Sequence, residues 1–301
     1  MPPQGGRLDR GGARGGEGGE RAGVRAVKWL ALALPLLLAG CNQNQESGEP
    51  VSTVDLEHFR DGTEAPEPAP EPSEAVASAC ADETFEGVGF THCVARPGAQ
   101  SIGMALLGDG GAPYRSFAAY RAAHPDEQVA FAMNGGMFDD TGNPIGYYVE
   151  NGDRRTTLNR NDGTGNFHLK PNGVFYGSGN SWHVMDSESF YNTVSDRPRF
   201  GTQSGPMLVI DGQIHPEITE NGPSRYIRNA VGVDAAGNAH FVISDADVSF
   251  GVMARYFRDQ LHTPNALYLD GVVSSLWDPA TGRMDVRAPL GPLIVVTNAA
   301  P

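Results

Sequence analysis

The stretch Met207-Leu-Val-Ile-Asp-Gly-Gln-Ile214 places an Asp-Gly pair between two apolar runs. Asp-Gly is a favoured sequence for the two-residue turn of a β-hairpin, so this stretch predicts two antiparallel strands. A second hairpin is predicted further along, where Val231–Val233 and His240–Ile243 flank Ala235-Ala236-Gly237-Asn238. Hairpins of this kind indicate a domain built mainly from antiparallel sheets.

Other short apolar runs, separated by Gly, Asn and Asp, extend these sheets. They predict strands at Val129–Met133, Val174–Tyr176, Trp182–Met185, Ala266–Leu269 and Leu293–Val296. Helical signals are fewer. Ser116 is placed to cap a helix over Phe117–His124 that Pro125 ends, and Ser249 precedes apolar residues at helical spacing. These residues are Phe250, Met253, Ala254, Phe257 and Leu261. The expected fold class is α+β, with mixed, mostly antiparallel sheets and a few packed helices.

Composition and charge exclude some protein classes and some binding partners. The chain has 301 residues, and its hydrophobic content of 40% is enough for a core but too low for a polytopic membrane protein. Residues 1–40 carry six Lys/Arg and three acids, which is a net charge of +3, so the rest carries −14 − 3 = −17. An acidic body argues against nucleic acid as a partner, and it leaves open a small anionic substrate held in a local positive pocket.

The N-terminal region has the pattern of an export signal. Arg21, Arg25 and Lys28 precede the apolar run Trp29–Ala39, which is too short to span a bilayer. The run ends in Leu-Ala-Gly-Cys41, which resembles a bacterial lipoprotein signal cleaved before the cysteine. This resemblance implies a lipidated Cys41 and a membrane attachment through the lipid, with an ordinary secreted protein as the alternative.

The residue after the cysteine and the residues before the signal give two further expectations. Asn42 stands where an Asp favours inner-membrane retention, so the resemblance implies an outer-membrane lipoprotein that faces the periplasm. The Gly- and Arg-rich residues 1–23 are unusual ahead of a signal, and Val24 is a candidate initiator.

An acidic, Pro-rich segment follows the signal. The sequence predicts a signal region at 1–41, an extended linker at 42–79 and one folded domain at 80–301. Two cysteines remain in the exported part, Cys80 and Cys93, and a disulfide is the default outside the cytoplasm. Free thiols or a metal pair are the alternatives.

Five polar clusters, four of which contain glycine, lie at the ends of predicted strands. They are Asn134-Gly135-Gly136, Lys170-Pro171-Asn172-Gly173, Gln203-Ser204-Gly205-Pro206, Arg228-Asn229, and Asp270-Gly271 with Ser274-Ser275. Each one alone reads as a turn, whereas five in one domain indicate a convergent polar site. The sequence lacks the nucleophile elbow, the Walker A loop and the His-Glu-x-x-His motif, and no cofactor is expected. The acidic stretch Asp139-Asp140-Thr141-Gly142-Asn143 lacks the EF-hand ligand order and reads as a loop, with a cation site as the alternative.

The ordered set of clusters resembles the phosphodiester glycosidase domain family. The matching motifs are Met133–Phe138, Pro144–Gly146, Gly165–Phe167, Lys170–Phe175, Gln203–Pro206, Ser224, Arg228–Gly232, Leu269–Gly271 and Ser274-Ser275. The resemblance covers about residues 130–296 and is strongest to the bacterial secreted branch, which often begins with a Cys-containing strand like Phe90–Val94. It implies hydrolysis of a sugar from a glycosyl phosphodiester, with an envelope glycan as another possible ligand.

The family reaction suggests roles for individual residues. Its transition state has oxocarbenium character and a departing phosphate, which calls for an anion clamp and a carboxylate beside the anomeric carbon. Arg228 is the expected clamp, with a structural salt bridge as the alternative, and Asp270 is the expected carboxylate, with a turn aspartate as the alternative. Asp245 and Glu150 are candidates for a second carboxyl group.

The remaining polar residues of the clusters are expected to bind substrate. They are Asn134, Gly135, Lys170, Asn172, Gln203, Ser204, Asn229, Gly271 and Ser274. The amides suit sugar hydroxyls or phosphate oxygens, and the two serines suit the leaving group. Two other functions compete with hydrolysis: a non-catalytic glycan- or phosphoglycan-binding lipoprotein of the envelope, and a purely structural envelope lipoprotein.

Overall fold

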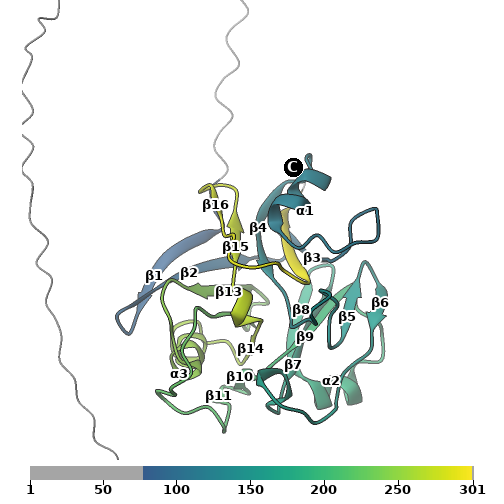
Figure 1. The fold of residues 1–301 in the computed structure, drawn as a ribbon. Coiled ribbons are helices and arrows are strands. Elements are labelled where there is room, and N and C mark those ends of the chain that lie inside the picture. The colour runs from purple at the N-terminus through teal and green to yellow at the C-terminus, as the bar shows by residue number, and fades with distance from the viewer. Residues whose placement is uncertain (1–76, 300–301) are drawn as a thin grey trace, which may run out of the picture. The chain divides into compact units, whose positions relative to one another are not determined.

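A computed structural model describes residues 77–299 of the chain. The predicted signal region 1–41, Cys41 and the linker up to residue 76 lie outside these residues. The described part contains three sheets and a few short helices (Figure 1). No helix within residues 77–299 has the length and apolar character needed to cross a membrane.

The largest sheet has seven strands. Their order across the sheet is β1 (Cys80–Phe85), β2 (Val88–Ala95), β13 (Ala239–Ser244), β12 (Asn229–Val233), β14 (Asn265–Tyr268), β10 (Met207–Ile210) and β11 (Gln213–Ile214). The β10–β11 hairpin is confirmed, with Ile210 opposite Gln213. Asp211 and Gly212 take φ values of 47° and 77°, which is the left-handed pair that the tightest hairpin turn requires.

Two five-stranded sheets complete the framework. One has the order β16 (Arg283–Met284), β15 (Leu276–Asp278), β4 (Val129–Asn134), β17 (Leu293–Asn298) and β3 (Gln100–Ala105). The other has the order β6 (Asp153–Thr156), β5 (Tyr148–Glu150), β9 (Phe200–Ser204), β7 (Gly173–Ser178) and β8 (Ser181–Asp186). Every pairing between these strands is antiparallel, and with the helices this confirms the α+β class.

The core lies where the three sheets meet. Phe131 of β4, Phe175 of β7 and Phe241 of β13 are fully buried, and each comes from a different sheet. The ring centroids of Phe131 and Phe175 lie 5.3 Å and 5.6 Å from that of Phe241, within the range of edge-to-face packing. This aromatic contact joins the sheets into one hydrophobic unit.

Three short α-helices pack on the sheets. Helix α1 (Phe117–Ala123) and helix α3 (Phe250–Arg255) begin at the predicted caps, since Ser116 and Ser249 accept hydrogen bonds from the first-turn N–H groups. Helix α3 continues as a π-helical turn, Tyr256–Gln260. The sequence did not predict α2 (Ser187–Thr193), which is capped by the Asp186 carboxylate. Short 3₁₀ turns form at Asn166–His168 and Gly271–Val273.

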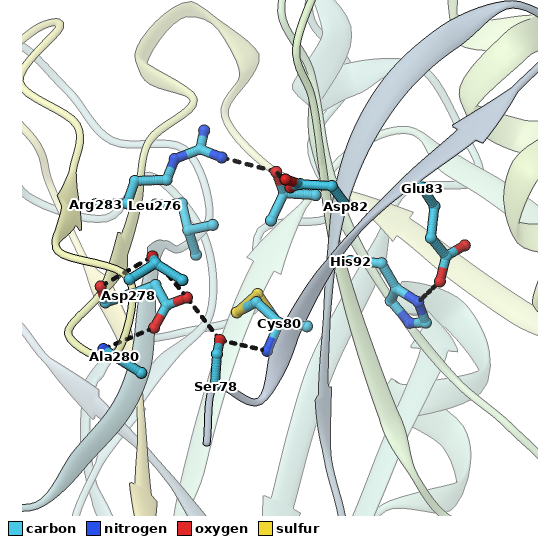
Figure 2. The surroundings of a disulfide bond; sticks show 12 residues. Ser78, Cys80, Asp82, Glu83, His92, Leu276, Asp278, Ala280 and Arg283 are labelled. Atoms are coloured by element: carbon cyan, nitrogen blue, oxygen red, sulfur yellow. Dashed lines mark hydrogen bonds and ion pairs between the residues drawn. A yellow bond between two sulfur atoms is a disulfide. The ribbon is translucent and has the colours of Figure 1, made fainter. Parts of the chain in front are cut away.

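The expected disulfide between Cys80 and Cys93 is confirmed (Figure 2). The two cysteines face each other directly across β1 and β2, with a Cα–Cα distance of 3.9 Å. The Ser78 hydroxyl accepts a hydrogen bond from the Cys80 N–H at 2.9 Å and donates to Asp278 of β15 at 2.7 Å. The bridge and these hydrogen bonds anchor the edge strand β1 to its own sheet and to the neighbouring one.

Candidate functional site

Three of the predicted polar clusters meet where β4 ends and β12 begins. The Asn229 side-chain amide donates to the Asn134 side-chain oxygen at 3.0 Å, and the Ser274 hydroxyl donates to the Asn229 side-chain oxygen at 2.9 Å. These three side chains are at most 1% exposed. The asparagine cluster, defined here as Asn134, Asn229 and Ser274, is therefore a buried hydrogen-bonded network between two sheets.

The asparagine cluster fixes the chain around Asp270. The Asn134 amide donates to the Asp270 carbonyl at 2.9 Å, and the Asn134 side-chain oxygen also accepts from the Ser275 N–H at 2.9 Å. The Gly135 carbonyl accepts from the Asp270 N–H at 3.4 Å. These amides are satisfied inside the protein, so in this structure they position Asp270 rather than face a ligand.

Asp270 has the environment of a reactive carboxylate. Its side chain is half-buried and accepts a hydrogen bond from the Val272 N–H at 3.3 Å. Burial raises the pKa of this carboxyl group, and the Val272 N–H opposes that rise. No cation forms an ion pair with Asp270 within residues 77–299. Val272 is 78% exposed, which places this turn at the surface and within reach of a ligand.

Tyr268 is a site residue that the sequence reasoning missed. It is the last residue of β14 and precedes Asp270 by two residues, so its nearness in the sequence was a usable signal. Burial and the Asp270 charge raise the pKa of Tyr268 to about 12 although Arg228 opposes them, so the phenol stays protonated. A Cβ at Gly271 would lie 1.8 Å from the Tyr268 hydroxyl. Gly271 therefore makes room for the phenol.

Arg228 lies behind Tyr268 and is fully buried. Its Nε donates to the Val248 carbonyl at 2.9 Å, and its Nη2 donates to the carbonyl and hydroxyl oxygens of Ser224 at 3.0 Å each. The guanidinium carbon lies 3.6 Å from the centroid of the Phe250 ring, a close cation–π contact. Burial lowers the pKa of Arg228.

This environment changes the expectation for Arg228. Nη1 is the guanidinium nitrogen that has no hydrogen-bond partner among residues 77–299. A two-pronged phosphate contact uses two adjacent nitrogens, and two of the three are already bound to the protein. The geometry therefore assigns Arg228 to supporting Tyr268 and the Ser224–Val248 region in place of a bidentate clamp.

Gln203 and Ser204 end β9 beside Gly136. The Gln203 side chain accepts from the N–H groups of Tyr147 and Asn159, both at 2.9 Å, and donates to the Ser187 hydroxyl at 3.0 Å. It holds loops together and has little capacity left for substrate. Ser204 differs, because its hydroxyl is buried and has no partner within residues 77–299.

Asn172 and Lys170 also make contacts within the protein. The buried Asn172 amide donates to the Phe167 carbonyl at 2.8 Å. The Lys170 ammonium group donates to the Arg160 carbonyl at 2.9 Å and to the Asp162 carboxylate at 2.6 Å, on an exposed surface. Neither side chain contacts the asparagine cluster or Asp270.

The two candidates for a second carboxyl group lie apart from Asp270. Asp245 follows β13, which β12 separates from β14, and its carboxylate is exposed and stands 3.5 Å from the Thr91 hydroxyl. Glu150 accepts from the Tyr148 hydroxyl at 3.1 Å and pairs with Arg155 at 3.4 Å. Strand β5 pairs with β9 so that Glu150 lies toward the Phe200 end, away from Ser204 and Asn134. The spacing of these residues along the sequence did not indicate how far Asp245 or Glu150 lies from Asp270.

Comparison with known proteins shows a similar bacterial protein. YigE, an uncharacterized protein of Escherichia coli (strain K12), is 41% identical over 150 residues, which are 50% of this chain and 58% of YigE. The chain thus spans little more than half the length of that relative.

One solved structure shares the fold at low sequence identity. The catalytic domain of zebrafish N-acetylglucosamine-1-phosphodiester alpha-N-acetylglucosaminidase, auto-inhibited by its pro-peptide, superposes with a TM-score of 0.51 and 16% identity, covering 73% of this chain and 82% of that one. A hypothetical protein from Synechocystis gives a TM-score of 0.45 and 15% identity, covering 73% of this chain and 61% of that one. The family model for phosphodiester glycosidases matches residues 127–296, which is more than half of the chain. The chain therefore belongs to the phosphodiester glycosidase family.

Proposed function

We propose that this protein is an exported hydrolase that releases a sugar from a glycosyl phosphodiester, with Asp270 beside the anomeric carbon. The observation that carries this proposal is the Asp270 carboxylate itself. It is half-buried, lacks an ion-pair partner among residues 77–299, and is held by a buried network that joins two sheets. Family membership supports the reaction class.

The chemistry requires an ionised carboxylate near the positive charge that develops on the sugar. Ionised Asp270 stabilises this charge more in the transition state than in the ground state, which is the condition for catalysis. Phosphate is already a good leaving group, so a strong general acid is not needed. The protonated Tyr268 hydroxyl, backed by Arg228, donates a hydrogen bond to a phosphate oxygen.

The proposal includes the location of the protein in the cell. A lipid on Cys41 attaches the protein to the bacterial outer membrane on the periplasmic side, and the acidic linker lets the domain reach envelope polymers. Support comes from the sequence pattern before Cys41 and from the Cys80–Cys93 bridge, since disulfides persist outside the cytoplasm. Cys41→Ser should move the protein from the membrane fraction to the soluble fraction, and a variant that stays membrane-bound would contradict the lipid anchor.

One assay tests the activity. The protein is incubated with UDP-GlcNAc and other sugar-1-phosphodiesters, and the released sugar is measured. We expect release by the parent protein and by Asp211→Asn, an exposed aspartate in a turn that serves as a matched control, and a large loss in Asp270→Asn. Saturable binding of these compounds without any sugar release would favour the glycan-binding alternative.

A further inference from the structure

A cavity of about 520 Å³ lies beside the sheet that contains β5 and β9 and shares no residue with the asparagine cluster or Asp270. Its lining comes from the segments around β6 and α2. The residues that matter here are Tyr147, Arg154, Arg160, Tyr191, Asp196 and Arg197.

The cavity is locally basic in an acidic protein. Three arginines and one aspartate line it, whereas residues 41–301 as a whole carry −14 − 3 = −17. Arg160 is already paired with Glu188. Arg154 and Arg197 form no ion pair within residues 77–299, and Arg197 has a long hydrogen bond of 3.4 Å to the Gly152 carbonyl. Two unpaired guanidinium groups at one cavity form a site for an anion.

A tyrosine lines the same cavity as the two arginines. The Tyr147 side chain is 5% exposed and packs edge-to-face on Phe190 at 4.9 Å, so its position is fixed. Burial raises the pKa of Tyr147, while Arg154 and Arg197, which line the same cavity, act in the opposite direction. The hydroxyl has no hydrogen-bond partner among the residues that the structure describes. It is free to donate to the same anion.

An aromatic surface lies beside these groups. Tyr191 is 60% exposed although the Arg160 guanidinium stacks on its ring at 4.0 Å. A tyrosine held by a stacked arginine loses little conformational freedom when a ligand packs on it, and its ring offers an apolar face to the C–H groups of a sugar. The cavity thus combines an anion site with a sugar platform.

We propose that this cavity binds a phosphorylated sugar, with the phosphate between Arg154 and Arg197 near the Tyr147 hydroxyl and the sugar ring against Tyr191. The ligand is either a free sugar phosphate or a phosphate-bearing unit of an envelope glycan. This site is separate from hydrolysis at Asp270. The buried Gln203 lies between the two regions: its side chain accepts from the Tyr147 N–H, and its carbonyl stands against Gly136.

Isothermal titration calorimetry of the full chain with glucose 6-phosphate tests the proposal. We expect saturable binding that Arg154→Ala with Arg197→Ala weakens by about 100-fold, since each charge-assisted contact is worth about a factor of ten. Arg121→Ala, an exposed arginine on α1 outside the cavity, is the matched control and should bind like the parent. The mutated arginines are exposed, so the variants should melt at the parental temperature.

Two further binding measurements identify the ligand. Tyr191→Ala should weaken glucose 6-phosphate but leave inorganic phosphate unchanged, which separates the sugar contact from the anion contact. A phosphorylated dextran oligosaccharide that binds more tightly than glucose 6-phosphate would identify a glycan unit as the ligand, and equal affinity would identify the free sugar phosphate. Absence of saturable binding to the parent, or equal binding by the double arginine variant, would overturn the site even if Asp270 proves catalytic.

Discussion

Asn229 at the start of β12 and Asn134 at the end of β4 belong to different sheets and are joined side chain to side chain. The Asn229 amide donates to the Asn134 side-chain oxygen at 3.0 Å and to its carbonyl at 3.3 Å. Asn134 in turn holds the Asp270 carbonyl. The two sheets therefore set the position of the candidate catalytic carboxylate together, through one buried amide pair.

Replacing Asn134 by alanine should be costly. Asn134→Ala removes the buried side-chain oxygen that accepts from the Ser275 N–H and from the Asn229 amide, which keeps its longer bond to the Asn134 carbonyl. It also removes the donor to the Asp270 carbonyl, and each buried group left unsatisfied costs about 1–3 kcal/mol. We expect the free energy of unfolding to fall by about 2 kcal/mol or more, measured by urea denaturation. Asn192→Ala on the exposed face of α2 is the control and should change little. Equal stability of the two variants would remove the structural role of the amide pair.

Activity should depend on the protonation of Asp270. Burial raises the pKa of this carboxyl group above its ordinary value of 3.8, so the ionised form is lost at a higher pH than for an exposed aspartate. We expect kcat/KM for a sugar phosphodiester to fall on the acid side as pH drops through this raised pKa. The parent protein should show this acid limb. A rate that stays constant down to the ordinary aspartate pKa would contradict the need for an ionised Asp270.

Arg228 should contribute to the stability of the fold. In Arg228→Lys the charge remains, but one ammonium group replaces a planar group that bonds Val248 and Ser224 at once. We expect a loss of about 2 kcal/mol or more in the free energy of unfolding, from the lost charge-assisted hydrogen bonds. Arg225→Lys, at an exposed neighbouring position, should be neutral. If the Arg228→Lys protein keeps the parental stability but binds the phosphodiester more weakly, Arg228 contacts the phosphate directly.

Local signals in the sequence predicted the hairpins and helix caps well. Asp211-Gly212 adopts the positive φ pair that this dipeptide favours, and Ser116 caps α1. Elements without such signals were missed. Strand β6 reads Asp-Arg-Arg-Thr and is largely exposed, so it lacks apolar alternation, and α2 consists of weak helix formers that depend on the Asp186 cap.

Only part of the site was predicted, because buried amides with different roles look alike in the sequence. Asn134 and Asn229 were recognised as polar residues at strand ends, and they do meet. Gln203 has the same sequence character but satisfies loop backbone groups on the other side of its strand. A buried amide that holds a loop and one that supports a site both appear in the sequence as polar residues at strand ends, so three-dimensional contacts are needed to separate them.

The Cys80–Cys93 bridge should contribute measurably to stability. It closes a loop with a sequence separation of 13, for which loop entropy gives about 3 kcal/mol. We expect the double variant Cys80→Ser with Cys93→Ser to unfold at a lower urea concentration than the parent. Mass spectrometry of the native protein should find neither thiol open to alkylation. Two alkylatable thiols in the native protein would show that the bridge does not form.

A chain of polar side chains on the largest sheet should make the protein sensitive to acid. His92 Nδ1 lies 2.8 Å from Glu83, His92 Nε2 lies 2.9 Å from His240 Nδ1, and His240 Nε2 lies 3.1 Å from Asp234. Tyr256 donates to the second oxygen of Glu83 at 2.6 Å. Since the two imidazoles share one short contact, a charge on both rings brings like charges together in a half-buried place.

The pKa values of His240, Glu83 and Asp234 are all lowered in the folded protein. Burial and the neighbouring His92 lower the pKa of His240, although Asp234 opposes them. Burial raises the pKa of Glu83 and of Asp234, but hydrogen bonds from Tyr256 and His92, and from Asn238 and His240, lower both pKa values overall.

Through these three groups the fold binds fewer protons than the unfolded chain, so their contribution to stability should be lost as pH drops below about 6.5, first through His240 and then through the two carboxylates. The free energy of unfolding, measured by urea denaturation at a series of pH values, should decrease steadily from neutral to acidic pH. His240→Gln removes the first of these titrations, so its stability should vary less with pH between about 5 and 6.5. His262→Asn, at an exposed turn position, should keep the parental pH dependence. Equal pH dependence of the parent and of His240→Gln in this range would show that His240 is not held in its neutral form.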